Sequence, residues 1–525
     1  MKKILPKPAN TTEYPLSYIP EPVQIKMIKP PVSEHAERQF PEKYDLRTDN
    51  RVTPVKNQGI YGTCWSHAAL ASIESSLMPL EPNPDYSENN IVNLDNFDYG
   101  FDEGGTAQMA IAYLARWAGP VNESEDPYPK PDESPRNLFP VKHLQNAEFL
   151  YLTASDNGSV KAIIMDYCAC YTAFYWNMAN YNSDTCAYYT NTQNSSNHSV
   201  AIIGWDDTFP ATNFKLQPPG DGAFLIKNSW GTKFGDQSYF WISYHTIPIT
   251  TTLSFHNAQS TDNCGGACEY YYFGWTSSMG FETEFVEFSS ISDASVNVVG
   301  FYTTCIGVVY DISVYTDLQD AKVSSSGTLA GNVSGTMENA GDYTVTLPFD
   351  ANVTAKKQFS VIIKFKINED FPYPIPMESN NFGYTSGAVV KQGQNFVSAD
   401  GKNWADASQL PAGLAGNVCI KAFGLSSSPE KISVYHLFPG YEFNVTKLDV
   451  TQFNTKPEII VTGGALKEKQ KQKAKILTKQ YPKDTIECQW LAKVTGGYYY
   501  NMSIKEKKEG HSSANPGSPS ISPMY

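Results

Sequence analysis

A cysteine in the first quarter of the chain has neighbours that suit a nucleophile. Cys64 follows a Gly-Thr pair and precedes a segment whose apolar residues recur at roughly helical spacing: Ala68, Leu70, Ile73 and Leu77. We therefore expect Cys64 at or beside a helix N-terminus. Unpaired backbone N–H groups and the helix dipole favour a thiolate there, and the thiolate is the nucleophilic form of cysteine.

Two later segments supply a base and a group to orient it. His198 begins one predicted strand, and a second predicted strand that starts near Gly222 ends at Asn228 and Trp230. Adjacent antiparallel strands would bring His198 and Asn228 together. The amide oxygen would then fix the imidazole for proton transfer from a thiol. We expect Trp230 to cover that hydrogen bond.

An amide side chain upstream of Cys64 completes the candidate site. Gln58 can point its N–H groups at the place where a carbonyl oxygen becomes negative, beside the backbone N–H of Cys64. A lone cysteine before a helix is more often a buried structural residue. The prediction of a nucleophile therefore depends on the presence of Gln58, His198 and Asn228 in the same chain.

These motifs resemble the papain family of cysteine peptidases. The matching residues are Gln58, Gly62-Thr63-Cys64-Trp65, His198 and Asn228-Ser229-Trp230-Gly231. His198 lies 134 residues after Cys64 (198 − 64), within the roughly 130–150 typical of that family. Asn228 lies 164 residues after Cys64 (228 − 64), an excess explained by a Pro-rich loop over residues 209–221.

The resemblance implies a helical lobe and a β-barrel lobe with the site in the cleft between them. It also implies that Gly104 and Gly105 bind extended substrate through their backbone, that Trp230 lies at the substrate site, and that no metal or organic cofactor is needed. Tyr61 and Phe234 depart from the family pattern. His67, one turn after Cys64, is a rival base, but it points back along its own helix and lacks an orienting asparagine.

The composition limits the other functions of this chain. A chain of 525 residues is long enough for two or three domains, and a net charge of −14 argues against nucleic acid as the main partner. No apolar run approaches the ~18 residues of a transmembrane helix. The nine cysteines leave one free thiol and up to four bridges, with a fully reduced set as the alternative.

The fold class that we predict is α+β: a papain-like two-lobed peptidase, then an antiparallel β-sandwich and a small β-rich C-terminal region. The sandwich resembles the lectin-like domain that follows the peptidase in some secreted bacterial and archaeal relatives, and we expect Trp404 in its core. The predicted parts are a Pro-rich leader (1–40), the peptidase (41–250), a linker (251–267), the lectin-like domain (268–424), the β-rich region (425–508) and a disordered tail (509–525).

The function that follows is a cysteine-type endopeptidase that forms a thioester acyl-enzyme with protein or peptide substrates. Residues 268–424 are a candidate carbohydrate or cell-surface glycan binder, and no nucleic acid partner is expected. The alternatives are a non-catalytic surface adhesion protein on a peptidase scaffold and a cell-wall peptide amidase. We expect an extracellular or cell-surface location, although Met1-Lys2-Lys3 is not followed by a signal-peptide core. The leader is expected to pack on the surface; an extended strap across the cleft is the alternative.

Overall fold

The structure, a computed structural model, describes most of the chain up to residue 424 and only strands beyond it. The described ranges are 15–21, 38–261, 266–280, 284–292, 295–320, 323–354, 357–366, 373–411, 413–424 and strands β25–β31. The predicted disordered tail over 509–525 lies outside the described residues.

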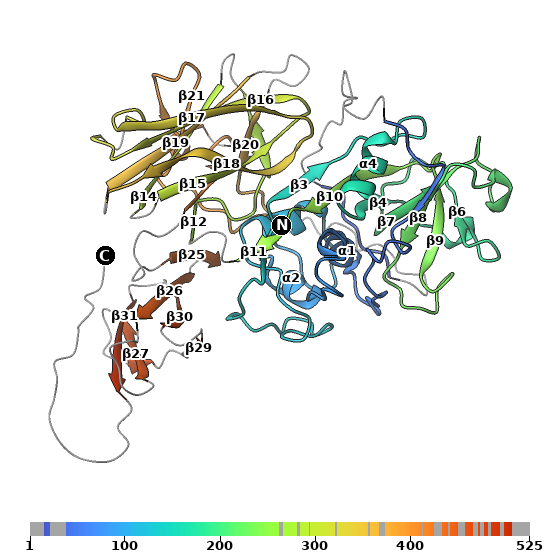
Figure 1. Ribbon diagram of the computed structural model, residues 1–525, viewed down its shortest axis with the longest axis horizontal. Coiled ribbons are helices and arrows are strands. Elements are labelled where there is room, and N and C mark those ends of the chain that lie inside the picture. The colour runs from blue at the N-terminus through green and yellow to red at the C-terminus, as the bar shows by residue number, and fades with distance from the viewer. Residues whose placement is uncertain are drawn as a thin grey trace.

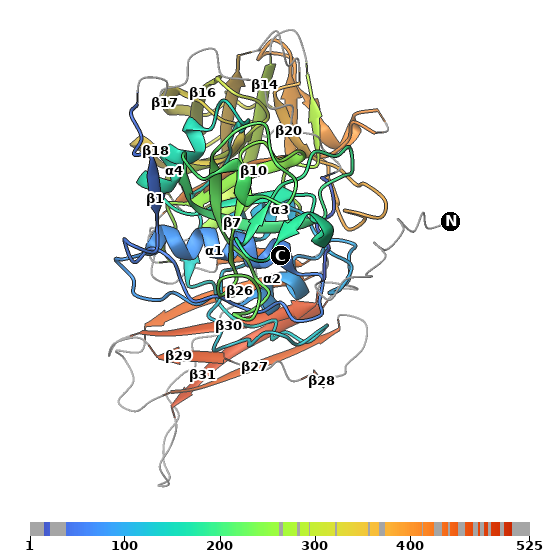
Figure 2. The same cartoon turned by 90° about the vertical axis from the view of Figure 1, so that its right-hand side faces the viewer.

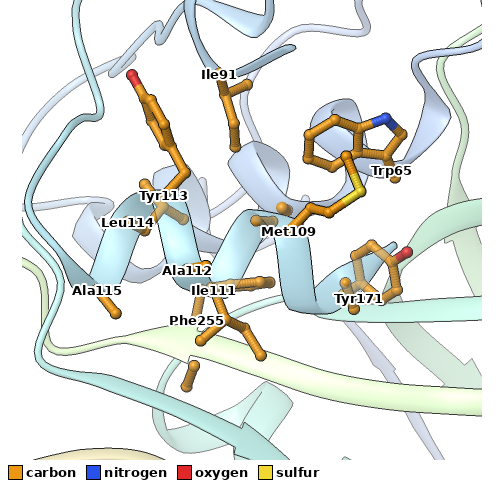
Figure 3. Packing of buried hydrophobic residues seen from close by; sticks show 14 of the residues in the cluster. Trp65, Ile91, Met109, Ile111, Ala112, Tyr113, Leu114, Ala115, Tyr171 and Phe255 are labelled. Carbon is orange, nitrogen blue, oxygen red and sulfur yellow. The ribbon is translucent and has the colours of Figure 1, made fainter. Parts of the chain in front are cut away.

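Three helices form the helical lobe of the peptidase: α1 (Cys64–Leu77), α2 (Glu88–Leu94) and α3 (Ala107–Ala115). Hydroxyl side chains cap two of them, since Ser87 accepts from the N–H of Asn90 and Thr106 from that of Met109. Apolar side chains of α3 pack towards Tyr171 and Phe255 of the sheet, with Trp65 of α1 beside Met109 (Figure 3). The helix that begins at Cys64 is therefore packed into the apolar core, which fixes its position.

The sheet of the peptidase carries the other candidate site residues. Its strand order runs β3-β10-β4-β7-β8-β9-β6-β5, with β1 paired to β7. Strands β7 and β8 are adjacent and antiparallel, as predicted for the segments that carry His198 and Asn228. The elements are β1 (Lys43–Asp45), β2 (Lys142–His143), β3 (Asn146–Phe149), α4 (Gly158–Asp166), β4 (Cys170–Phe174), β5 (Tyr181–Asn182), β6 (Ala187–Tyr188), β7 (His198–Asp206), β8 (Ala223–Lys227), β9 (Tyr239–Ser243), β10 (Ile249–His256) and β11 (Gln259–Ser260).

A β-sandwich with its own apolar core follows the peptidase, as expected. One face is the six-stranded sheet β17-β16-β19-β14-β21-β22, and Figure 2 shows β14, β16 and β17 above the peptidase strands β7 and β10. Its strands are β12 (Gly266–Glu269), β13 (Ser277–Met279), β14 (Glu284–Ser292), β15 (Ser295–Thr303), β16 (Val308–Thr316), β17 (Thr328–Met337), β18 (Gly341–Asn352), β19 (Lys357–Phe365), β20 (Ile375–Glu378), β21 (Asn395–Ser398), β22 (Ala405–Asp406), β23 (Asn417–Val418) and β24 (Ile420–Gly424).

The two domains share one sheet. Strand β18 of the sandwich pairs with β3 of the peptidase, and Figure 1 shows the two side by side. The order β12-β24-β15-β18 therefore continues directly into β3-β10-β4. A buried ion pair reinforces the junction, because Lys421 Nζ lies 3.2 Å from Asp342 Oδ2 and donates to the carbonyl of Ala115 in α3 at 2.9 Å. The lectin-like domain is therefore packed into the peptidase and not tethered to it.

Two predictions about this region need correction. The expected linker begins at residue 251, yet β10 continues through His256 between β3 and β4. Residues 252–256 are all buried, and the strand pairs on both sides, so β10 is a central strand of the sheet. Trp404, which we expected in the sandwich core, is half-buried at the turn before β22 and lies outside the described core cluster.

The C-terminal part of the chain is β-rich, as predicted. The strands form two small antiparallel sheets, β25-β26-β30-β29 and β28-β27-β31. They are β25 (Ser433–Phe438), β26 (Tyr441–Asp449), β27 (Pro457–Ala465), β28 (Lys471–Gln472), β29 (Leu477–Gln480), β30 (Thr485–Lys493) and β31 (Tyr498–Glu506). Within the described residues, none of the helices has the length and apolar character needed to cross a membrane.

Candidate active site

Cys64 is the first residue of α1, as its sequence context predicts. Its side chain is fully buried, and its sulfur lies 3.7 Å from the hydroxyl of Ser17 in the leader. Burial raises the pKa of the Cys64 thiol, while hydrogen bonds with Ser199 and Ser17 act in the opposite direction. Desolvation therefore outweighs these hydrogen bonds in this covered state, and the thiol form is favoured.

His198 and Asn228 meet through the pairing of β7 and β8. The Nε2 of His198 lies 2.9 Å from Oδ1 of Asn228, so Nε2 carries the proton of that bond. Among the described residues, Nδ1 of His198 has no hydrogen-bond partner. Burial lowers the pKa of His198 to about 4, against the opposing effect of the Asn228 bond. The imidazole is thus neutral and fixed in one orientation, with Nδ1 able to accept a proton.

Trp230 lies over this pair. Its ring stacks on the imidazole of His198 with centroids 4.5 Å apart and 17° between the planes, and Phe234 packs edge-on against it at 4.7 Å. The expected cover over the His198–Asn228 bond is therefore present. The assignment of Trp230 to substrate binding stays a prediction.

Gln58 is held at the site from both ends of its amide. Its Oε1 accepts from the hydroxyl of Ser229 at 2.7 Å, which leaves Nε2 to donate to the carbonyls of Tyr61 at 3.0 Å and Pro15 at 3.4 Å. The backbone N–H of Gln58 also donates to the carbonyl of Ser229 at 2.8 Å. The role of Ser229 could not be predicted from its place in the Asn-Ser-Trp motif, because it depends on a contact between distant segments.

Residues 15–21 of the leader cross the site, which corrects the expectation of surface packing for this segment and agrees with the alternative of an extended strap. The N–H of Gly105 donates to the carbonyl of Ser17 at 3.1 Å, and the N–H of Ile19 donates to the carbonyl of Gly105 at 3.0 Å. On the other rim, the N–H of Tyr18 donates to the carbonyl of Asn197 at 3.0 Å. Residues 15–21, called here the strap, therefore cross the site as an extended segment over Cys64. The amino-acid composition of the leader does not predict this position, because main-chain groups make the hydrogen bonds.

The glycines of the cleft wall are needed for this close approach. A Cβ on Gly104, whose φ is +94°, would lie 2.1 Å from the carbonyl oxygen of Ser17, and a Cβ on Gly62 would lie 2.7 Å from Cβ of Ser17. A Cβ on Gly105 would instead strike the ring of Trp65 at 2.5 Å. The predicted glycine pair thus lies beside an extended peptide, and Gly105 pairs with it through its backbone.

His67, the rival base, is bonded to the backbone at the start of its own helix, whereas His198 is bonded to Asn228. Its Nδ1 lies 3.0 Å from the carbonyl of Thr63, and burial lowers the pKa of His67 to about 3. Its ring borders a small polar pocket with Lys56, Glu74 and Lys227. There Lys56 pairs with Glu74 at 3.1 Å. Asn228 and Ser229 of the site also line this pocket.

The free cysteines limit how many of the predicted disulfides can form. Cys64, Cys168, Cys170, Cys186 and Cys419 are free. The fully bridged set of four pairs is therefore excluded. Cys264 lies outside the described residues.

Comparisons with known families agree with this geometry. Residues 40–272 match the papain family of cysteine proteases, and residues 269–424 match the lectin like domain. The first match extends beyond β10, in keeping with its place in the peptidase sheet.

Several curated proteins are similar to the peptidase part of the chain. A probable cysteine protease of Arabidopsis thaliana is 26% identical over 216 residues, covering 39% of this chain and 56% of its own. A viral cathepsin of Spodoptera litura multicapsid nucleopolyhedrovirus is 29% identical (38% and 56%), and cathepsin J of Mus musculus 28% identical (42% and 66%). This chain therefore spans less than two thirds of the length of each.

A solved structure resembles both domains together. The cysteine protease and lectin-like domains of Cwp84, a surface layer associated protein of Clostridium difficile, superpose with a TM-score of 0.65 at 23% identity, covering 74% of this chain and 90% of that one. The same clostridial protease after propeptide cleavage gives the same TM-score over 73% of this chain and 99% of that chain. At this identity the likeness establishes the fold. Residues 40–272 form a papain-family cysteine protease domain, and a lectin-like domain follows in residues 269–424.

Proposed function

We propose that this chain is a cysteine endopeptidase that hydrolyses peptide bonds through Cys64, His198, Asn228 and Gln58. The observation that carries the proposal is the bond of 2.9 Å between His198 and Asn228, which leaves Nδ1 of His198 open at the start of β7. Ser199, the next residue along β7, contacts the thiol of Cys64. A nucleophile, a base and the group that orients the base thus come from three elements of one site.

Each group has one role in the reaction. His198 takes the thiol proton at Nδ1, and the sulfur of Cys64 attacks the substrate carbonyl. Gln58 Nε2 and the N–H of Cys64 hold the oxyanion of the tetrahedral intermediate. Collapse of that intermediate breaks the C–N bond, the leaving amine takes the proton from His198, and a thioester remains. Water then attacks the thioester with His198 as base, which releases the acid and restores the thiol.

The strap holds this site closed. It brings the hydroxyl of Ser17 to 3.7 Å from the sulfur of Cys64 and the carbonyl of Pro15 to 3.4 Å from Nε2 of Gln58. A substrate carbonyl would need the same amide. Hydrolysis therefore requires that the strap leaves the cleft, by cleavage or by opening.

A thiol-specific comparison tests the proposal. Cys64→Ala is expected to abolish casein and peptide hydrolysis and labelling by a thiol-directed epoxide, after the strap has been displaced. Cys168→Ala is the matched control, because Cys168 is also a buried free thiol and burial raises its pKa to about 12. Full activity of Cys64→Ala, or equal losses in both variants, would contradict the assignment.

We further propose that the leader, the peptidase domain, the lectin-like domain and the β-rich region are distinct functional parts. The lectin-like domain would direct the peptidase to a glycan or another ligand at the cell surface. The surface-layer association of the clostridial relative supports this location. Because β18 pairs with β3, the binding test uses the whole chain carrying Cys64→Ala on a glycan array. A uniform lack of binding would count against carbohydrate.

A further inference from the structure

The amide that orients His198 has one end without a partner. Oδ1 of Asn228 accepts two hydrogen bonds, from Nε2 of His198 at 2.9 Å and from the N–H of Ser229 at 2.9 Å. Nδ2 of the same amide is buried, and no residue that the structure describes is bonded to it. A buried amide N–H that stays unpaired is costly, because it has lost its bonds to water. This end of Asn228 therefore calls for a further partner.

A second buried atom without a partner belongs to His67 of α1. Nδ1 of His67 lies 3.0 Å from the carbonyl of Thr63, so Nδ1 carries the proton of that bond. Burial lowers the pKa of His67 to about 3, which keeps the ring neutral. Nε2 is therefore a hydrogen-bond acceptor, and within the described part of the chain nothing donates to it.

Both side chains line the same small pocket. Its wall comes from α1, β7 and the end of β8, and includes His67, Ser199, Lys227 and Asn228. The volume open to the centre of a water molecule is about 20 Å³. One buried water needs ~10–15 Å³ and roughly two to four polar partners. The pocket is thus large enough for a single water.

The chemistry of the wall limits what can occupy the pocket. The occupant has to accept a hydrogen bond from Nδ2 of Asn228 and donate one to Nε2 of His67. A halide ion cannot donate, and a metal cation cannot accept, whereas water does both. The ammonium of Lys227 already donates to Oγ1 of Thr53 at 2.8 Å. Water is therefore the occupant that suits both free atoms.

We propose that one water in this pocket joins Nδ2 of Asn228 to Nε2 of His67, and that His67 is a positioning residue for the catalytic amide. The water satisfies the free end of the amide, which keeps Oδ1 on Nε2 of His198. The inference rests on the proposed peptidase function and adds a residue to its machinery. His67 acts only through Asn228 and takes no part in bond cleavage, so the rival base of the sequence has a different role.

A double-mutant cycle in the full-length chain tests this role. Every variant carries Tyr18→Ala, which removes a side chain of the strap that is only 3% exposed and so favours the open site. His67→Phe keeps a ring but has no acceptor, and should lower kcat by about 3- to 10-fold with KM unchanged, as expected for one net hydrogen bond. His67→Gln, which offers a donor and an acceptor, should restore most of that loss. In a chain that also carries Asn228→Ala, His67→Phe should have no further effect on kcat.

The matched control is His143→Phe. His143 is 4% exposed and His67 is 5% exposed, so the two rings are buried to a similar degree. The ring of His143 stacks on Trp117 with centroids 3.6 Å apart, where a phenyl ring can take its place. This variant should leave kcat unchanged. An unchanged kcat in His67→Phe, or the same loss with and without Asn228→Ala, would overturn the inference.

A crystal structure of the full-length chain carrying Cys64→Ala separates this inference from the peptidase proposal. Density for one water within ~2.7–3.2 Å of both Nδ2 of Asn228 and Nε2 of His67 is expected. Such a water supports the bridge even if no variant hydrolyses any peptide, an outcome that would refute only the peptidase function. An empty pocket, or an occupant that contacts only one of the two side chains, refutes the bridge whatever the rates.

Discussion

Removal of the Tyr18 side chain is the perturbation that tests the closed site most directly. Tyr18→Ala removes a ring that is 3% exposed and a hydroxyl bonded to Thr251. Burial of a side chain of this size contributes ~1.5–3 kcal/mol, and its net hydrogen bond contributes ~0.5–1.5 kcal/mol. The total of about 2–4.5 kcal/mol would shift the equilibrium between closed and open strap by roughly 30- to 2,000-fold.

The assay compares initial rates of the intact full-length chain with and without Tyr18→Ala. Hydrolysis of a fluorogenic peptide and the rate of epoxide labelling at Cys64 should rise together, up to the level of the fully open enzyme. Mass spectrometry checks that the leader is uncut. Tyr373→Ala, at a tyrosine that is 52% exposed in the lectin-like domain, is the control and should change neither rate. A wild-type chain already as active as Tyr18→Ala would refute the reasoning.

Three further predictions concern pH, the oxyanion site and the domain junction. Burial raises the pKa of the Glu21 carboxyl in the closed state, against hydrogen bonds from Tyr18 and Thr251 that lower it. Closure is therefore strongest below the free value of about 4.3 and weakens as the pH rises through the raised pKa, so activity of the intact chain should increase with pH. Glu21→Gln should flatten that profile, and an unchanged profile would contradict the account. Gln58→Ala should lower kcat by ~10²–10³ with little change in KM, measured on the opened enzyme; a change confined to KM would exclude the oxyanion role. Lys421→Met leaves Asp342 buried without its partner at 3.2 Å and should destabilise the chain by ~3–5 kcal/mol. The double variant Lys421→Met with Asp342→Leu should regain most of the lost stability, measured by thermal unfolding. If the double variant is as unstable as Lys421→Met alone, the unpaired Asp342 is not the cause of the loss.

Much of the candidate site could be predicted from the sequence because it depends on local features. The helix that starts at Cys64 follows from apolar spacing, and the meeting of His198 with Asn228 follows from two adjacent antiparallel strands. The predicted start of the linker was wrong because it depends on contacts between distant segments. Residues 252–256 alternate between polar and apolar types, but their burial and their pairing with β3 and β4, which the sequence does not show, make them a central strand.

Residue types and their order alone determined which chemistry this protein can perform: a thiol, an imidazole and two amides stand at spacings that suit acyl transfer. The tertiary structure decided whether the site is open or covered and which protonation states its groups adopt. Backbone bonds from Gly105 and Asn197 place the strap over Cys64, and burial beneath it favours a neutral thiol and a neutral imidazole. Neither effect is encoded in a local pattern, because main-chain bonds carry no side-chain signature and desolvation depends on every segment packed around the site.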